Sequence, residues 1–165
     1  MSVVDERIIR ISDFNDTDFL QYKLPCMFIG FPHCTFKCGK EVCQNFPLYD
    51  GGRGINVPAK TFVKRYLGFD ITKSIVLGGL EPLDSMADVK DLIDAFREET
   101  DDPIVVYTGY NEDEERARDF KEYVKNMGYK NIIVKFGRYI PNDEGVFSEV
   151  LGVHLASSNQ YAVEL

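Results

Sequence analysis

The chain has 165 residues, of which 44% are apolar and 13% aromatic, and this length predicts one domain, residues 1–165, that buries its own core. Its 27 acidic and 19 basic side chains give a net charge of −8, which argues against nucleic acids and anionic membranes as partners. The N-terminal residues lack the apolar core of a secretory signal, and no apolar run reaches the ~18 residues that span a bilayer, so we expect a cytoplasmic protein.

The first part of the chain predicts two strands and one helix. β-Branched and apolar runs indicate strands over residues 7–11 and 25–31. Residues 47–58 are rich in Gly and Pro and predict a long loop. Pro58 is suited to the first turn of a helix that ends at Gly68.

In the second part of the chain, strand-like and helix-like segments alternate. Apolar runs predict strands over residues 73–79, 102–110 and 130–137. Ser85 and Asn111 are each expected to cap a helix that follows one of these strands. The apolar stripes of the two helices are Met86, Val89, Leu92, Ile93 and Phe96, and then Phe120, Tyr123, Val124 and Met127 before a terminating Gly128.

This alternation predicts an α/β domain with a mainly parallel sheet. Beyond Gly137 the periodicity is weaker, and residues 150–157 are the best candidate for another extended segment. Ligands of such sheets bind at the carboxyl ends of the strands. The segment that begins at Cys34, "GGLEP" (78–82) and "YTGY" (107–110) each follow a predicted strand, so we expect all three to meet at one edge.

The four cysteines fall into two classes. Cys26 begins an apolar strand and is expected to be a small core residue. Cys34, Cys38 and Cys43 lie within ten residues of one another in a polar segment. Thiolates so close together repel one another unless a bound cation neutralises them, so this segment predicts a metal or cluster site. Spacing alone leaves zinc and an iron–sulfur cluster open, with His33 either a fourth zinc ligand or an exposed histidine.

Four segments, taken together, resemble the radical SAM superfamily. "FIGFPHCTFKC" (28–38) resembles its first strand and first two cluster cysteines, and "LGGLEPL" (77–83) its Gly-Gly-Asp/Glu-Pro-Leu turn. "YTGY" and "ASSNQ" (156–160) resemble segments of the anaerobic ribonucleoside-triphosphate reductase activating proteins within that superfamily. The resemblance implies a partial (βα) barrel-like domain with a mainly parallel sheet.

The resemblance also implies a cofactor and its ligands. Cys34, Cys38 and Cys43 would hold a [4Fe–4S] cluster, and S-adenosylmethionine would complete the fourth iron and be cleaved to methionine and a 5′-deoxyadenosyl radical. Glycines let the backbone approach such a ligand closely, and Glu81 could accept hydrogen bonds from the methionine ammonium. No catalytic protein side chain is expected. The residues expected to contact the cofactor are Gly78, Gly79, Glu81, Pro82, Tyr107 and Asn159.

For partners, the resemblance implies a large glycyl-radical protein, an anaerobic ribonucleotide reductase, and a flavodoxin-type electron donor. The chain departs from the family pattern in several places. Four residues separate Cys38 from Cys43 where the family has two, and Val42 replaces an aromatic residue before the last cysteine. Leu80 interrupts the Gly-Gly-Glu-Pro turn, the N-terminal Gly-Pro-Gly segment is absent, and Phe136-Gly137 stands in place of Asp-Gly. These departures leave two alternatives open. One is a radical SAM-like protein with another target, and the other is a non-enzymatic zinc or iron–sulfur binding module.

Overall fold

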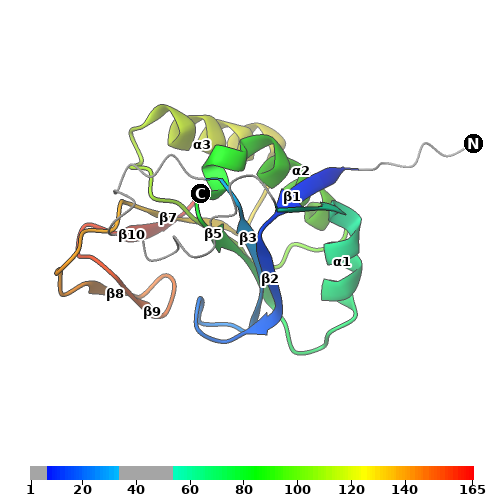
Figure 1. Ribbon diagram of the computed structural model, residues 1–165, viewed down its shortest axis with the longest axis horizontal. Helices are drawn as coiled ribbons and strands as arrows, with labels where there is room; N and C mark the ends of the chain where they lie inside the picture. The colour runs from blue at the N-terminus through cyan, green and yellow to red at the C-terminus, as the bar shows by residue number, and fades with distance from the viewer. Residues whose placement is uncertain (1–6, 34–53) are drawn as a thin grey trace, which may run out of the picture.

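The computed structural model describes residues 7–33 and 54–165, which form an α/β fold around a six-stranded sheet (Figure 1). The predicted α/β class is confirmed. In their order across the sheet, the strands are β10 (Tyr161–Glu164), β7 (Ile132–Phe136), β6 (Ile104–Tyr107), β5 (Ser74–Gly79), β3 (Cys26–Phe31) and β2 (Asp13–Asp18).

The sheet is mixed. Its four central strands, β7, β6, β5 and β3, are parallel, whereas the outer strands β10 and β2 are antiparallel to their neighbours. All four parallel strands coincide with apolar runs from which a strand is predicted. Neither outer strand is predicted, because β2 is almost entirely polar (DFNDTD) and β10 is short.

Two further pairs of strands lie outside the main sheet. β1 (Ile8–Ile11) confirms the first predicted strand and pairs with β4 (Ile55–Pro58), so the prediction of a loop is wrong for residues 55–58. The earlier part of that predicted loop, residues 47–53, lies outside the described residues. β8 (Val146–Ser148) pairs with β9 (Val153–Leu155), which falls within the predicted extended segment 150–157.

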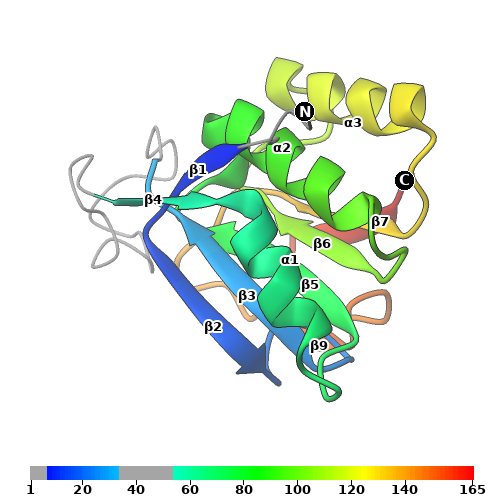
Figure 2. The same cartoon turned by 90° about the vertical axis from the view of Figure 1, so that its right-hand side faces the viewer.

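The helices α1 (Ala59–Leu67), α2 (Met86–Arg97) and α3 (Glu115–Met127) all pack on one face of the sheet, as Figure 2 shows. Their apolar stripes, except Met127, which is 49% exposed at the end of α3, form one core cluster with alternate strand residues, among them the fully buried Ile29, Leu77 and Val106. Within the described residues, none of the helices is long and apolar enough to cross a membrane.

The opposite face of the sheet has its own smaller core. Cys26, Val76, Val105 and Ile133 project from this face and pack with Tyr22, Leu151 and Leu155. Because both faces are covered, the central strands read as continuous apolar runs. Cys26 is fully buried, as predicted, and burial raises the pKa of its thiol to about 12. Cys26 is therefore an unreactive core residue.

The ends of the helices test the capping predictions. α1 begins directly after Pro58 and is followed by Gly68, as expected. Ser85 precedes α2, but its hydroxyl makes no capping hydrogen bond, because the short helix η3 (Pro82–Ser85) leads directly into α2. The prediction that Asn111 caps α3 is wrong: α3 begins at Glu115, and Asn111 instead opens a turn in which its backbone N–H donates to Glu114 Oε1 at 2.9 Å.

Candidate functional site

The three cysteines of the predicted cluster site, Cys34, Cys38 and Cys43, lie outside the described residues. Among residues 7–33 and 54–165, no group of three or more His, Cys, Asp or Glu side chains is arranged to hold a metal ion. Three closely spaced thiolates are nevertheless a donor set that suits an iron–sulfur cluster. The described residues show where the segment that carries them begins.

This segment leaves the sheet beside the "GGLEP" turn. β3 ends at Phe31, but the chain stays hydrogen-bonded to the end of β5 for two more residues. The backbone N–H of Leu80 donates to Phe31 O at 3.1 Å, and that of Glu81 donates to His33 O at 3.0 Å. The His33 side chain is exposed. The residue immediately before Cys34 is therefore fixed next to Glu81, at the edge where the parallel strands end; we call this the carboxyl edge.

Glu81 connects two turns at the carboxyl edge. Its side chain is only 5% exposed. Oε1 accepts from the Thr108 hydroxyl at 2.6 Å and from the backbone N–H of Leu83 at 3.0 Å, and Oε2 accepts from the backbone N–H of Gly109 at 2.7 Å. Burial raises the pKa of Glu81 to about 7, although all three hydrogen bonds act in the opposite direction.

Gly78 and Gly79 are explained by packing between strands. Gly79 has a φ of +90°, and a Cβ there would lie 2.6 Å from Phe31 N and 2.7 Å from the Cα of Gly30. A Cβ on Gly78 would lie 2.9 Å from the Phe28 ring. The missing side chains therefore make room for β3, and the predicted role of both glycines in approaching a cofactor stays a prediction. Pro82, also a predicted contact, is buried at the start of η3.

Tyr107 lies on the sheet face opposite the helices. Its hydroxyl donates to the backbone carbonyl of Gln21, in the connection between β2 and β3. Lys135 Nζ lies 5.9 Å from the centre of the Tyr107 ring, and a Cβ on Gly78 would be 3.8 Å from Tyr107 Cβ. Because the Tyr107 hydroxyl is engaged within the protein, a contact between its ring and a ligand stays a prediction.

The "ASSNQ" segment connects β9 to β10 and packs against the turn that follows β7. Asn159 Nδ2 donates to Arg138 O at 2.9 Å, and Gln160 Nε2 donates to Gly137 O at 3.2 Å. Gln160 Oε1 accepts from the backbone N–H of Ser157 at 3.1 Å. Asn159 is exposed, whereas Gln160 and Ser157 are buried. Asn159, the predicted contact, is thus held at the carboxyl edge by its own amide.

Hydrogen bonds connect all of these segments along one edge. His33 pairs with Glu81, Glu81 with Gly109, and the backbone N–H of Gly137 donates to Tyr110 O at 3.0 Å. Gly137 in turn accepts from Gln160. The expectation that "GGLEP" and "YTGY" meet at one edge is confirmed, and the "ASSNQ" segment joins them. That the cysteine-containing segment lies at the same edge stays a prediction, because residues 34–53 lie outside the described residues.

Sequence reasoning missed two residues of this edge, Thr108 and Lys135. Thr108 is 1% exposed and supplies the shortest hydrogen bond to Glu81. Lys135 is 7% exposed and its Nζ donates to Gly137 O at 3.2 Å. The available signals were a hydroxyl directly after an apolar strand and a lysine inside the apolar run of β7 (IIVKF). A lysine is rarely buried to this degree unless its charge is paired.

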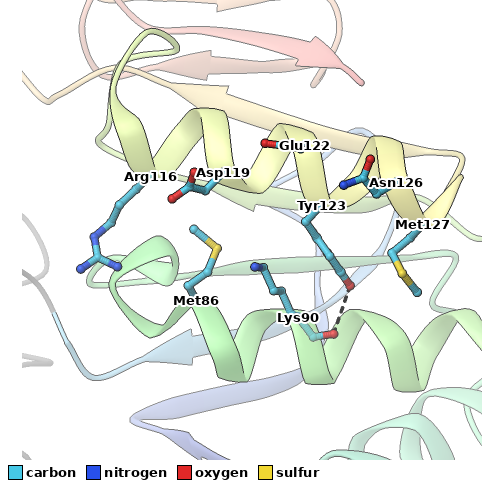
Figure 3. Close-up of a pocket in the computed structure, with 8 residues that line it drawn as sticks. All are labelled: Met86, Lys90, Arg116, Asp119, Glu122, Tyr123, Asn126 and Met127. Carbon is cyan, nitrogen blue, oxygen red and sulfur yellow. Dashed lines mark hydrogen bonds between the residues drawn. The ribbon is translucent and has the colours of Figure 1, made fainter.

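A groove of about 430 Å³ lies between α2 and α3 (Figure 3). Its walls carry charges of both signs, and the hydroxyl of Tyr123 donates to Lys90 O at 3.2 Å across it. None of the predicted site residues lines this groove. The lining residues are Met86, Lys90, Arg116, Asp119, Glu122, Tyr123, Asn126 and Met127.

Comparison with known proteins identifies no family for this chain. No protein-family model and no curated protein matches this chain.

Proposed function

We propose that this chain is a radical SAM enzyme that activates a glycyl-radical protein, an anaerobic ribonucleotide reductase. Cys34, Cys38 and Cys43 would hold a [4Fe–4S] cluster beside the carboxyl edge, where S-adenosylmethionine binds. When bound, the cluster and S-adenosylmethionine supply a one-electron cleavage that yields methionine and a 5′-deoxyadenosyl radical. A flavodoxin-type protein in the cytoplasm would donate the electron.

One observation supports this proposal above the others. The chain immediately before Cys34 is hydrogen-bonded to Glu81, and Glu81 is hydrogen-bonded to the turn that follows β6. The cysteine-containing segment therefore starts at the edge of a parallel sheet where small ligands bind. The four parallel strands, with helices on one face, would form the centre of a partial (βα) barrel-like domain.

The residues of this edge would have defined roles. Glu81 Oε2 accepts one hydrogen bond within the described residues, from Gly109, and a carboxylate oxygen can accept two. Its second acceptor position suits an N–H of the methionine amino group. Tyr107 would offer its ring and Asn159 its exposed amide to the remainder of the cofactor, and the backbones of Gly78, Gly79 and Pro82 would border the same space.

A non-enzymatic zinc or iron–sulfur module is the second candidate. It is favoured by the finding that Gly78, Gly79 and Glu81 each have a structural reason within the protein.

A radical SAM-like protein with another target is a further alternative, and the longer spacing between Cys38 and Cys43 supports it.

Metal analysis separates a zinc module from the candidates that carry an iron–sulfur cluster, and cleavage of S-adenosylmethionine then separates a radical enzyme from a non-enzymatic iron–sulfur module. Protein reconstituted anaerobically with iron and sulfide should contain about four of each per chain and be brown. A colourless protein that retains one zinc per chain and takes up no sulfide would refute the radical proposal.

The target is tested separately, by mixing the cluster-loaded protein with an anaerobic ribonucleotide reductase and S-adenosylmethionine. A glycyl-radical EPR signal is expected, and its absence despite cleavage of S-adenosylmethionine would indicate another target.

A further inference from the structure

Thr108 occupies a defined position between the two turns of the carboxyl edge. It is the first residue after β6 and is 1% exposed. Its hydroxyl accepts from the backbone N–H of Tyr110 at 3.0 Å and donates to Glu81 Oε1 at 2.6 Å. A threonine hydroxyl has one proton. Because the Tyr110 N–H supplies its own proton, that of Thr108 is directed to Glu81.

Thr108 is itself held firmly. Its backbone N–H donates to Lys135 O at 2.9 Å, which continues the pairing of β6 with β7 for one residue beyond the strand. The backbone of Thr108 is therefore fixed by Lys135, and its hydroxyl is fixed separately by the backbone N–H of Tyr110. Such a group can impose an orientation on the carboxylate it contacts instead of following it.

We propose that Thr108 is a positioning residue, whose hydroxyl keeps Glu81 turned so that Oε2 faces Gly109 and can accept a further hydrogen bond from the amino group of a bound ligand. Thr108 does not touch the ligand on this proposal; it acts through Glu81. The ligand part of the inference rests on the proposed function, whereas the coupling between Thr108 and Glu81 does not.

The charges around Glu81 make this hydrogen bond important. Within the described residues, no cation forms a hydrogen bond or ion pair with Glu81, and the nearby negative charge of Asp84 raises its pKa further. Asp84 is bound to the hydroxyl of Tyr110 at 2.5 Å and lies 3.5 Å from Arg116 Nε on α3. From β3, His33 presents its backbone carbonyl to the Glu81 N–H. The Thr108 hydroxyl is therefore the principal group that favours the ionised carboxylate.

The first experiment needs no ligand. Thr108→Val removes the hydroxyl at nearly constant volume, Thr108→Ser retains it, and Thr108→Ala replaces the valine variant should that variant fail to fold. The titration of the Glu81 carboxyl carbon is followed by NMR, with Glu81→Gln identifying the signal. The midpoint should rise by about one pH unit in Thr108→Val, a tenfold change, and stay at the wild-type value in Thr108→Ser. An unchanged midpoint in Thr108→Val and Thr108→Ala would overturn the inference.

The second experiment uses the cluster-loaded protein. Affinities for S-adenosylmethionine and for 5′-methylthioadenosine, which lacks the amino-acid part, are compared between pH 6.5 and 8. Thr108→Val should weaken binding of S-adenosylmethionine by about fivefold near pH 7 and leave methylthioadenosine unaffected, and the difference from wild type should shrink as the pH rises. If wild type and Thr108→Val bound S-adenosylmethionine with equal affinity, the inference that Thr108 assists ligand binding through Glu81 would be overturned. Wild-type protein that binds no S-adenosylmethionine would refute the proposed function, while the titration would still decide the coupling.

Discussion

The backbone N–H of Glu81 donates to the carbonyl of His33 at 3.0 Å, so the residue before Cys34 is paired with the residue that joins β5 to β6. The segment that would hold a metal or cluster therefore begins next to a buried carboxylate. This relationship connects the two most informative motifs of the sequence through two residues, His33 and Glu81, that are more than forty positions apart.

Replacing a proposed cluster ligand and replacing the buried Cys26 should have different effects. Replacing Cys43 with Ala is expected to abolish the cluster, because three thiolates are the smallest set that the proposed site can use. Cys26→Ala removes a fully buried thiol and should lower the free energy of unfolding by about 1 kcal/mol while iron and sulfide stay at wild-type levels. Iron and sulfide assays on both variants check this. Loss of iron from the Cys26 variant would mean that the ligands are wrongly assigned.

Glu81 should make the protein less stable as the pH rises. Its pKa is about 7 in the folded protein and near 4.5 in the unfolded chain, so the folded state binds more protons between these values. Stability should therefore fall from pH 4.5 to pH 7 and level off above, by at most about 3 kcal/mol for this group.

Urea unfolding at several pH values measures this effect as the difference between wild type and Glu81→Gln, which cancels the contribution of other carboxyl groups. Between pH 4.5 and 7 the wild type should lose up to about 3 kcal/mol of unfolding free energy relative to Glu81→Gln. A difference that is constant with pH would show that Glu81 is ionised throughout.

Gly79 should tolerate no side chain. Gly79→Ala combines a φ of +90° with a Cβ 2.6 Å from Phe31 N, and we expect a loss of more than about 3 kcal/mol in stability. Gly128→Ala is the matched control, since Gly128 also has a positive φ, +69°, but nothing lies within 4 Å of its added Cβ. Its cost should be about 1 kcal/mol. Equal losses in chemical denaturation would attribute the whole effect at Gly79 to backbone conformation.

Asn159 and Gln160 should differ in what they affect. Gln160 is buried and bridges Ser157 and Gly137, so Gln160→Ala should cost about 1–3 kcal/mol in stability. Asn159 is exposed, and Asn159→Ala should change stability by less than about 1 kcal/mol while weakening the binding of S-adenosylmethionine. Unchanged affinity in Asn159→Ala would remove this residue from the proposed cofactor site.

The parts of the fold that follow from buried surface could be predicted from the sequence. The strands β3, β5, β6 and β7 are apolar because both of their faces are covered, and their runs stand out for that reason. β2 could not be found this way, because an edge strand has few buried positions and its sequence is polar. Asn111 was a plausible cap, but its turn is closed by the Glu114 carboxylate, and such a turn has no distinctive pattern.

The site was predictable in location but not in its internal contacts. The position of each motif after a strand was enough to bring Glu81 and Gly109 to one edge. That Thr108 would bond to Glu81, or that the Tyr107 hydroxyl would reach Gln21, depends on side-chain packing between segments distant in sequence. Gly78 and Gly79 suggested a ligand, whereas the space they leave is occupied by β3.

The most direct test of the proposed function is the cleavage of S-adenosylmethionine itself. Anaerobically reconstituted protein is mixed with dithionite and S-adenosylmethionine, and 5′-deoxyadenosine is measured by chromatography, with Cys43→Ala as the control. We predict 5′-deoxyadenosine from the wild-type protein and none from the variant. A wild-type protein with a fully loaded cluster that forms no 5′-deoxyadenosine would contradict the proposal.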